Sequence, residues 1–374
     1  MNKIRVSLKD KSYDIQIGKG ILRRINFRSF GAGKYAIITD SIVKNLYGRK
    51  LQRLIENQGL KAKLIDFPAG EVSKNWVEAG NLGRKLAKLG FDRDSLIVAL
   101  GGGVVGDLAG FVASFYLRGI NYVQIPTTLL AQVDSSIGGK TGIDIPEGKN
   151  LFGSFYQPKA VFIDIEFLKT LPETEIKNGL AEIIKYGMTQ NRELFEFLKK
   201  NIEKRDENFY LKVIEASAQI KSRIVELDEK ENELRKILNY GHTIGHAIEG
   251  IKRYKGITHG EAVALGMVYE GRISSKLGFL KRNDLERQNK LIDRAGLPTR
   301  YKGNIEGLIK IMRRDKKSRN EKLYFVLPLK IGKIKTRKNQ IAFPVEIDLI
   351  KKCLRNPGLN FGNGLMKLKD SIIN

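Results

Sequence analysis

The chain has 374 residues, of which 42% are hydrophobic and 29% are charged, as in a globular protein long enough for two domains. Its single cysteine, Cys353, excludes intramolecular disulfides and thiolate zinc sites and agrees with a reducing cytoplasm. The 67 basic and 41 acidic residues give a net charge of +26. Because the basic residues are dispersed and accompany no nucleic-acid-binding motif, the charge favours a surface that steers anionic substrates over a specific nucleic-acid partner.

The first half of the chain alternates short apolar runs with helical spacing. Its start, MNKIRVSLKDKSYDIQIG, alternates polar and apolar residues like a strand and lacks the apolar core of a signal peptide. Further strands are predicted at 34–40, 62–67, 95–100, 121–126 and 160–165, and a helix at 76–90. Strands that alternate with helices imply a parallel sheet with helices on both faces.

Residues 96–117 form an apolar stretch that is long enough to cross a bilayer. However, Asp107 lies at its middle and several glycines lie close together. An acid at the centre of a bilayer is costly, so we interpret the stretch as a buried strand, a turn and a buried helix, and we expect no membrane segment.

The pattern changes at Leu171, where Pro172 opens a region of long helical periods that runs to about residue 300. We therefore expect an α/β domain over residues 1–170 and a helical domain over 171–350. The Gly/Asn-rich end, 351–374, is expected to be a loosely attached tail.

The sequence GGGVVGD follows the predicted strand 95–100. Gly101, Gly103 and Gly106 fit the spacing G-x-G-x-x-G, in which backbone amides approach a diphosphate at a helix N-terminus. The signal is weak by itself, because glycine turns between strand and helix are common and this one comes late in the chain. Asp40, after an earlier strand, could hold an adenosine ribose, so a nucleotide site and a structural turn both stay open.

Two other segments place polar residues in apolar surroundings. The segment 126–150 is dense in glycine and polar residues, which favours the lining of a cleft over a solvated loop. Its candidate residues are Thr127, Thr128, Asp134, Ser135, Ser136, Lys140, Lys149 and Asn150. In GLAEIIKYG, Glu182 and Lys185 share one side of a helix among apolar neighbours, which argues against an ordinary surface ion pair.

All 3 histidines of the chain fall between positions 242 and 259. His242 and His246 are four residues apart and project from one helical face, so they could chelate one divalent ion with a third ligand from elsewhere. A His/His/Glu set with open positions would indicate a catalytic zinc, whereas two packing histidines are the plainer alternative. The preceding run 221–241 is predicted to be helical, and it carries Lys221, Arg235 and Asn239 toward the same region.

Taken in order, these segments resemble the 3-dehydroquinate synthase family. The matching motifs are GGGVVGDLAGFVASFYLRG, PTTLLAQVDSSIGGKTGIDIPEGKN, GLAEIIKYG, LNYGHTIGHAIE, HGEAVALGM and DKK. The resemblance implies an N-terminal Rossmann-like nucleotide-binding α/β domain and a C-terminal all-helical metal-binding domain. It also implies a homodimer.

The implied reaction converts 3-deoxy-D-arabino-heptulosonate 7-phosphate to 3-dehydroquinate and phosphate. In the family, NAD transiently oxidises the C5 hydroxyl, phosphate is eliminated, the hydride returns, and the opened ring closes by an intramolecular aldol step. The cofactors implied are NAD and Zn2+, with Co2+ as an alternative metal.

The resemblance also assigns residues. The implied metal ligands are Glu182, His242 and His259, which moves His246 from the metal to the substrate. Substrate contacts are expected from Asp134, Lys140, Asn150, Lys185, Lys221, Arg235, Asn239, His246 and Lys317, and Arg118 is expected to reach the partner's site. NAD contacts are expected from Asp40, Glu71, Lys74, Gly103, Gly106, Asp107, Thr127, Thr128, Lys140 and Lys149.

Two other functions remain to be tested. An NAD-dependent dehydrogenase of the same fold would accumulate NADH instead of recycling it. A nucleic-acid-binding protein would explain the charge but would leave the histidine cluster without a role.

Overall fold

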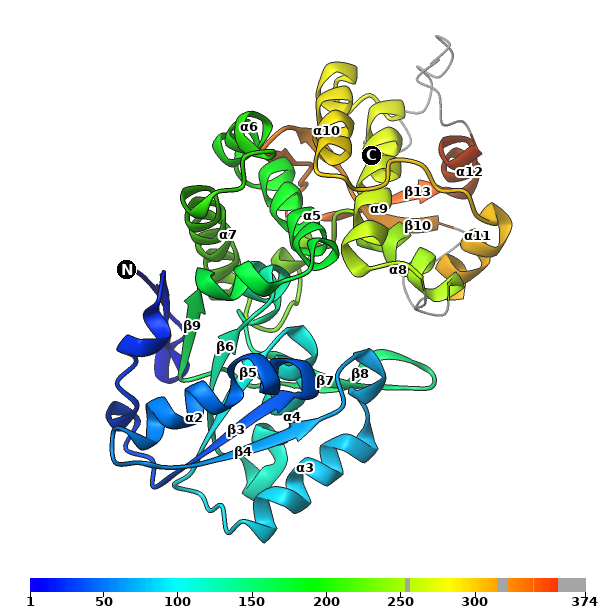
Figure 1. Cartoon of the computed structure of the whole chain (residues 1–374). Coiled ribbons are helices and arrows are strands. Elements are labelled where there is room, and N and C mark those ends of the chain that lie inside the picture. The colour runs from blue at the N-terminus through cyan, green and yellow to red at the C-terminus, as the bar shows by residue number, and fades with distance from the viewer. Residues whose placement is uncertain (253–255, 315–321, 339, 356–374) are drawn as a thin grey trace. The chain divides into compact units, whose positions relative to one another are not determined.

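The fold was analysed in a computed structural model, which describes residues 1–252, 256–314, 322–338 and 340–355 (Figure 1). The chain forms two compact units. The first comprises residues 1–176 together with 210–229, and the second comprises 177–209 and the chain from 230 onward. Residues 210–229 thus return to the first unit beyond the boundary expected near residue 170.

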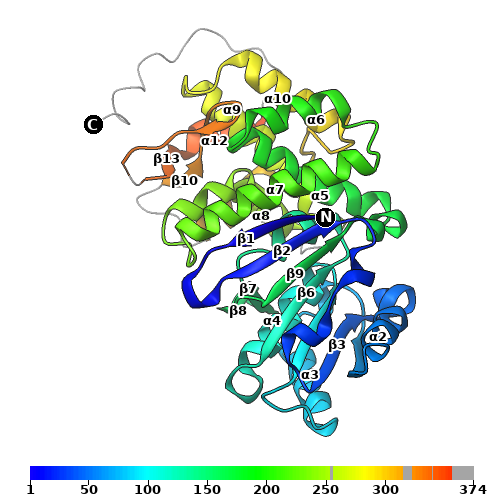
Figure 2. The same cartoon turned by 90° about the vertical axis from the view of Figure 1, so that its left-hand side faces the viewer.

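The first unit is built on a 7-stranded sheet of order β1-β2-β9-β6-β5-β3-β4. Its strands are β1 Asn2–Val6, β2 Tyr13–Gly18, β3 Lys34–Asp40, β4 Lys61–Phe67, β5 Leu96–Gly101, β6 Asn121–Pro126 and β9 Ala160–Asp164. Neighbours are parallel except β1 and β2, which pair antiparallel at the edge shown in Figure 2. The predicted parallel sheet is confirmed, and the five later strands match their predicted ranges within one residue at each end.

Both faces of this sheet are buried, which explains why its strands are almost continuously apolar. In β5, Ile97 and Ala99 face one core, whereas Val98 and Leu100 face the other. The first core is covered by α3 (Trp76–Lys88) and α4 (Gly103–Phe115), and the second by α2 (Arg49–Glu56).

The apolar stretch 96–117 divides into strand β5 and helix α4, as predicted. Among the residues that the structure describes, no helix is long and apolar enough to cross a membrane.

The strand order reverses direction between β3 and β5. From β3 the chain moves outward to β4, and it then crosses back to place β5 on the other side of β3. A reversal of this kind leaves a crevice beyond the carboxyl ends of the two strands, where open α/β sheets bind their ligands. Asp40 ends β3 and Gly101 ends β5, so both lie at this crevice.

Two local predictions of the sequence need correction. The end of the polar segment 126–150 is not a loop, because it belongs to the antiparallel hairpin β7 (Lys140–Ile145) and β8 (Gly148–Phe155). The predicted helical run 221–241 is also wrong: α7 (Glu207–Leu227) ends early, and a short 3-10 helix follows at Leu234–Asn239.

The second unit is mainly helical. Its helices are α5 Glu173–Thr189 (whose first turn belongs to the first unit), α6 Arg192–Asn201, α8 His242–Ile251, α9 His259–Lys276, α10 Arg282–Arg294, α11 Ile305–Arg314 and α12 Ile347–Arg355. Four short strands were not predicted: β10 Lys322–Val326, β11 Pro328–Lys330, β12 Lys333–Ile334 and β13 Ala342–Glu346. Helix α9 is buried along most of its length. Of the expected tail, residues 351–355 belong to α12, in which Cys353 is buried, and 356–374 lie outside the described residues.

Helices α8 and α9 approach so closely that only glycine fits between them. A Cβ atom on Gly266 of α9 would lie 1.8 Å from the backbone oxygen of Gly241, directly before α8. A Cβ atom on Gly245 would lie 3.1 Å from the backbone oxygen of Ala262. Because backbone atoms cannot rotate away like a side chain, this contact fixes the relative position of the two helices.

We therefore expect Gly266→Ala to lower the free energy of unfolding by about 3 kcal/mol or more, since the new methyl group must push the helices apart. The matched control is Gly80→Ala in helix α3, where a Cβ atom would meet nothing within 4 Å. There the better helix propensity of alanine should stabilise by about 0.5–1 kcal/mol. Calorimetric unfolding of both variants checks the prediction, and equal stability of Gly266→Ala and wild type would contradict it.

Candidate functional site

The histidines gather where two helices begin. His242 is the first residue of α8, and His259 is the first residue of α9. The ring centroid of His242 lies 5.2 Å from that of His246 and 5.3 Å from that of His259. Thr258 and Glu261 form a capping box that ends the preceding loop and starts α9 at His259.

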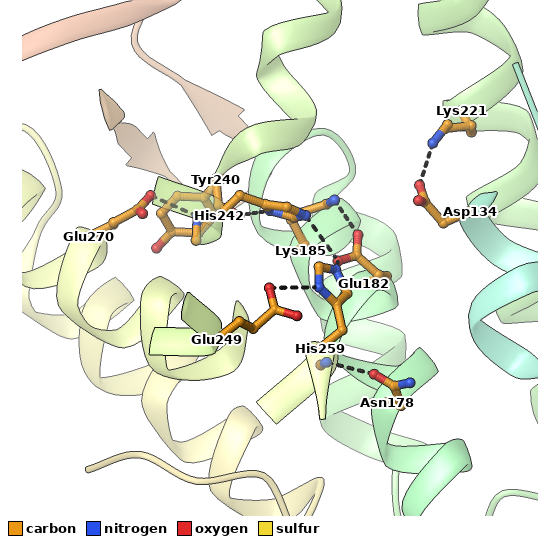
Figure 3. A network of polar contacts seen from close by, with 12 residues as sticks. Asp134, Asn178, Glu182, Lys185, Lys221, Tyr240, His242, Glu249, His259 and Glu270 are labelled. Atoms are coloured by element: carbon orange, nitrogen blue, oxygen red, sulfur yellow. Dashed lines mark hydrogen bonds and ion pairs between the residues drawn. The ribbon is translucent and has the colours of Figure 1, made fainter. Parts of the chain in front are cut away.

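Glu182 joins this cluster from helix α5. One turn earlier on α5, Asn178 accepts a hydrogen bond of 2.6 Å from the backbone amide of Gly260. Gly260 has no room for a side chain, because its Cβ atom would lie 2.4 Å from the backbone oxygen of Asn178. The start of α9 is thereby held against α5, and Glu182 faces His259 (Figure 3).

The three groups have the spacing of metal ligands. Oε1 of Glu182 lies 3.6 Å from Nε2 of His242 and 3.6 Å from Nε2 of His259. Ligand atoms about 2.0–2.1 Å from a tetrahedral zinc are about 3.3 Å apart, so the observed spacing needs only a small contraction. One carboxylate and two imidazoles form a donor set that suits catalytic zinc or cobalt.

A second group within the described residues has similar spacing. The ligand atoms of His246, Glu249 and His259 also lie within 4.8 Å of one another, as do those of Glu182, His242 and His259. His259 belongs to both groups, and His246, which the i, i+4 spacing paired with His242, belongs only to the second. The geometry alone therefore brings together two candidate sets around one imidazole.

His242 and His259 each have a partner at the ring nitrogen that faces away from Glu182. Nδ1 of His242 lies 3.2 Å from the backbone oxygen of Tyr240, and Nδ1 of His259 lies 3.5 Å from Oε2 of Glu249. A proton on Nδ1 leaves the lone pair on Nε2, on the side of Glu182. These contacts orient both rings for coordination before any metal binds.

The electrostatics of the cluster favour a cation. Burial lowers the pKa of His242 well below its ordinary value, and the nearby Lys185 lowers it further. Burial also acts to lower the pKa of His259, but the carboxylates of Glu182 and Glu249 outweigh it and raise this pKa to about 9. Lys185 forms a buried ion pair with Oε2 of Glu182. Burial therefore favours the neutral form of His242, which is the form that can coordinate a metal, and the two carboxylates attract positive charge to the position of His259.

Glu270 is a residue that the sequence analysis missed. It is fully buried in α9 and accepts hydrogen bonds from the amides of Gly241 at 2.7 Å and Ile244 at 3.1 Å. A carboxylate at this place satisfies donors of the first turn of α8 and complements the helix dipole. An acid inside the apolar run of α9 was the signal that could have identified it.

In the first unit, the glycine turn leads from β5 into α4. A Cβ atom on Gly106 would lie 2.6 Å from Oε1 of Gln124, and one on Gly103 would lie 3.1 Å from Oγ of Ser135. No side chain in the described part of the chain caps α4 at Gly102. The first amides of the helix are therefore available to a diphosphate.

Other candidate residues lie at the same edge of the sheet. Asp40 follows β3, and its Oδ1 accepts hydrogen bonds from the amides of Ile42 and Val43. Thr127 follows β6, and its amide donates to the backbone oxygen of Gly101 at 2.9 Å. Thr128 accepts a hydrogen bond from the amide of Ala131 at 3.2 Å. The carboxyl ends of three neighbouring strands thus carry expected nucleotide contacts.

Lys74 organises a polar cluster in this unit. Its Nζ lies 2.5 Å from Oδ2 of Asp107 and 2.5 Å from Oδ1 of Asn150. Burial acts to lower the pKa of Lys74, but the carboxylates of Asp107 and Glu71 outweigh it and raise this pKa. Lys149 completes the cluster through an ion pair of 3.3 Å with Glu71.

Asp144 supports this cluster and was not singled out from the sequence. Its side chain accepts from the amide of Asn150 at 2.9 Å, and its own amide donates to the backbone oxygen of Lys74 at 2.7 Å. It therefore joins hairpin β7–β8 to the segment around Lys74. Its place within the polar segment 126–150 was the available signal.

Lys221 and Asp134 form an ion pair of 2.5 Å within the first unit. The pair forms because α7, which carries Lys221, returns to that unit. Three of the remaining substrate candidates are exposed: Lys140 at the start of β7, Arg118, which has a φ of 69°, and His246 on α8. The side chain of Arg235 is buried, with 1% of it exposed. The side-chain amide of Asn239 donates a hydrogen bond of 3.3 Å to Glu231. Lys317 lies outside the described residues.

Comparisons with known proteins agree along nearly the whole chain. A 3-dehydroquinate synthase from Thermodesulfovibrio yellowstonii is 44% identical over 362 residues, which covers 95% of this chain and 99% of that protein. A solved 2-deoxy-scyllo-inosose synthase, complexed with carbaglucose-6-phosphate, NAD+ and Co2+, is 27% identical with a TM-score of 0.85, over 95% of this chain and 99% of its own. A solved 2-epi-5-epi-valiolone synthase from Streptomyces hygroscopicus, with NAD+ and Zn2+ bound, is 26% identical with a TM-score of 0.84, over 94% and 98%.

The models of the 3-dehydroquinate synthase N-terminal and C-terminal domains match residues 64–178 and 179–318, respectively. These matches cover the glycine turn, the Lys74 cluster and the histidine cluster. The chain belongs to the 3-dehydroquinate synthase family.

Proposed function

We propose that this protein converts 3-deoxy-D-arabino-heptulosonate 7-phosphate to 3-dehydroquinate and phosphate, with NAD and a divalent metal as resident cofactors. The observation that carries the proposal is the cluster of Glu182, His242 and His259, in a chain that is 44% identical to a 3-dehydroquinate synthase over 362 residues. The two solved cyclases, which are 26–27% identical to this chain, contain NAD+ together with Co2+ or Zn2+. Their contents support the proposal that this protein uses NAD and a divalent metal.

Glu182, His242 and His259 would hold the metal, which when bound supplies Lewis-acid polarisation of a substrate hydroxyl. The buried ion pair between Lys185 and the second oxygen of Glu182 restricts the rotation of that carboxylate. His246 is exposed on the same helix, and we assign its imidazole to holding or moving a proton on the substrate.

The nucleotide would lie along the carboxyl edge of the sheet. NAD when bound supplies the hydride acceptor and donor. The amide of Gly103, in the first turn of α4, would bind its diphosphate, and Gly106, whose own amide donates to the backbone oxygen of Gly102, would let the diphosphate approach because it has no side chain. Asp40 would bind a ribose through Oδ2, since its Oδ1 accepts from the amides of Ile42 and Val43. We assign the other NAD contacts to Glu71, Lys74, Asp107, Thr127, Thr128, Lys140 and Lys149.

The substrate carries a carboxylate and a phosphate, and the remaining candidates are mostly cationic. We assign substrate contacts to Asp134, Lys140, Asn150, Lys185, Lys221, Arg235, Asn239, His246 and Lys317. Cationic side chains bind such oxygens through charge-assisted hydrogen bonds. The net charge of +26 would also speed the encounter with an anionic substrate.

We also propose a homodimer, because the first unit exposes an aromatic surface formed by Trp76, Phe115 and Phe152. These side chains are 50%, 60% and 45% exposed, and the Trp76 and Phe152 rings stack edge to face at 5.4 Å. Exposed aromatic clusters are typical of protein interfaces. Arg118 lies three residues beyond Phe115 and is exposed, and we assign it to the site of the second copy. The single buried cysteine suits a cytoplasmic enzyme.

One assay tests the catalytic proposal: the protein with Zn2+, catalytic NAD and the heptulosonate phosphate. We expect phosphate and 3-dehydroquinate to form in equal amounts without lasting absorbance from NADH, because the hydride returns in each turnover. Accumulation of NADH on a polyol phosphate, without phosphate release, would instead identify a dehydrogenase. The affinity for duplex DNA, measured over a series of salt concentrations, tests the alternative of a nucleic-acid-binding protein. Binding through phosphate contacts would weaken steeply as the salt concentration rises.

Removal of a metal ligand should abolish activity without unfolding the first unit. We expect Glu182→Gln and His259→Ala to lose bound zinc and at least about a thousandfold in turnover, because two ligands hold a divalent ion poorly. Metal content and NAD affinity are the measurements, and Glu306→Gln on the exposed face of α11 is the control. Full zinc stoichiometry in either ligand variant would contradict the assignment.

The role of Arg118 can be tested in mixed dimers. We expect Arg118→Ala and Lys140→Ala each to be nearly inactive alone. After mixing and subunit exchange, random pairing should restore roughly a quarter of wild-type turnover, because one site in each mixed dimer has both residues intact. The unmixed variants carried through the same exchange are the controls. No recovery in proven heterodimers would place the arginine in its own subunit's site.

A further inference from the structure

His259 lies between two carboxylates that approach opposite ring nitrogens. Its Nε2 is 3.6 Å from Oε1 of Glu182, and its Nδ1 is 3.5 Å from Oε2 of Glu249 (Figure 3). The two nitrogens of an imidazole point away from each other, and in the neutral ring one carries a proton while the other carries a lone pair. One ring therefore cannot offer lone pairs to both candidate metal groups at once.

Glu249 lies on the same face of helix α8 as two of the histidines. His242, His246 and Glu249 follow at i, i+4 and i+7, so they share one face of the helix. Glu249 is only 5% exposed, whereas His246 is exposed. A carboxylate this deeply buried needs charged or hydrogen-bonded neighbours, and the Nδ1 side of His259 is one that it faces.

We propose that Glu249 is a positioning residue that holds the proton of His259 on Nδ1, so that the Nε2 lone pair faces Glu182 and His242. Glu249 then acts on the metal through His259 and is not itself a ligand. The inference rests on the proposed metal site, and it selects between the two groups that share His259. The two histidines also differ in the partner of Nδ1, because Nδ1 of His242 faces the neutral carbonyl of Tyr240 whereas Nδ1 of His259 faces a carboxylate.

The physical consequence is a more basic nitrogen at His259. A carboxylate that accepts the Nδ1 proton stabilises positive charge on the ring, and so strengthens Nε2 as a donor to a cation. The 3.5 Å separation is long for a hydrogen bond, and a cation on the opposite nitrogen would polarise the Nδ1–H bond and draw the two groups together.

The experiment compares Glu249→Gln with Glu249→Ala in the full chain. Glutamine keeps an acceptor of the same shape but removes the charge, whereas alanine removes both. We expect zinc affinity, measured by competition with a chelator, to fall roughly tenfold in the first and up to roughly a hundredfold in the second. The stoichiometry and the visible absorption bands of bound Co2+ should remain those of wild type, since the coordinating atoms are unchanged. Glu306→Gln, the same change on an exposed helical face, is the control.

Two results would overturn the inference. Unchanged zinc affinity in both Glu249 variants would show that the carboxylate only fills space. Altered Co2+ bands or lost stoichiometry would make Glu249 a ligand and favour the group with His246. Thermal unfolding without metal, together with NAD affinity, establishes that each variant is folded, and the conservative Glu249→Gln provides the comparison if the alanine variant is unstable.

A failure of the metal site itself would look different. If wild type bound no zinc, or if Glu182→Gln bound it as tightly as wild type, the proposed site would fail whatever Glu249 does. If Glu182→Gln lost the metal while both Glu249 variants retained full affinity, only the positioning role would be wrong.

Discussion

The arrangement of the histidine cluster depends on the contact between the backbones of α8 and α9. Because Gly266 has no side chain, the backbone oxygen of Gly241 occupies the space that a Cβ atom would fill. The two helices therefore begin at fixed positions, and their first residues, His242 and His259, come within 5.3 Å of each other by ring centroid. The same contact places Glu270 of α9 under the first amides of α8. Packing that leaves no void keeps the geometry of the imidazoles constant.

Buried charge is the second constraint on this unit. Glu182, Lys185 and Glu249 are nearly inaccessible, and isolated charges at such positions would cost several kcal/mol each. They are stabilised as a network with the imidazoles, in which the carboxylates raise the pKa of His259 to about 9. A network that attracts a proton to one ring will also attract a divalent cation, which binds in competition with that proton. The electrostatics that hold the cluster together therefore also prepare it for a metal.

For the first unit we propose the binding of the long nucleotide cofactor, and the sheet supplies the groups for it in a different way. Parallel strands end at one edge, so short segments far apart in the sequence supply neighbouring groups there. Lys74 follows β4, Asp107 lies on α4 and Asn150 belongs to hairpin β7–β8, yet the three side chains meet in one cluster. The aromatic surface around Trp76, on which we propose that a second copy binds, lies on the same unit. Each unit thus carries one part of the chemistry proposed for the protein.

The sequence by itself determined the parallel sheet, the glycine turn and the family, because these depend on local periodicity and on motifs that are contiguous in the chain. It also identified Glu182, His242 and His259 as candidates, although His246 was equally acceptable from helical spacing alone. Only the tertiary structure showed that Oε1 of Glu182 faces both Nε2 atoms, and that Glu249 faces the other side of His259. The return of α7 to the first unit, where Lys221 pairs with Asp134, was likewise decided by contacts between distant segments. The physical reason is that a side chain's direction and its buried partners depend on which backbones meet, and no local pattern encodes that meeting.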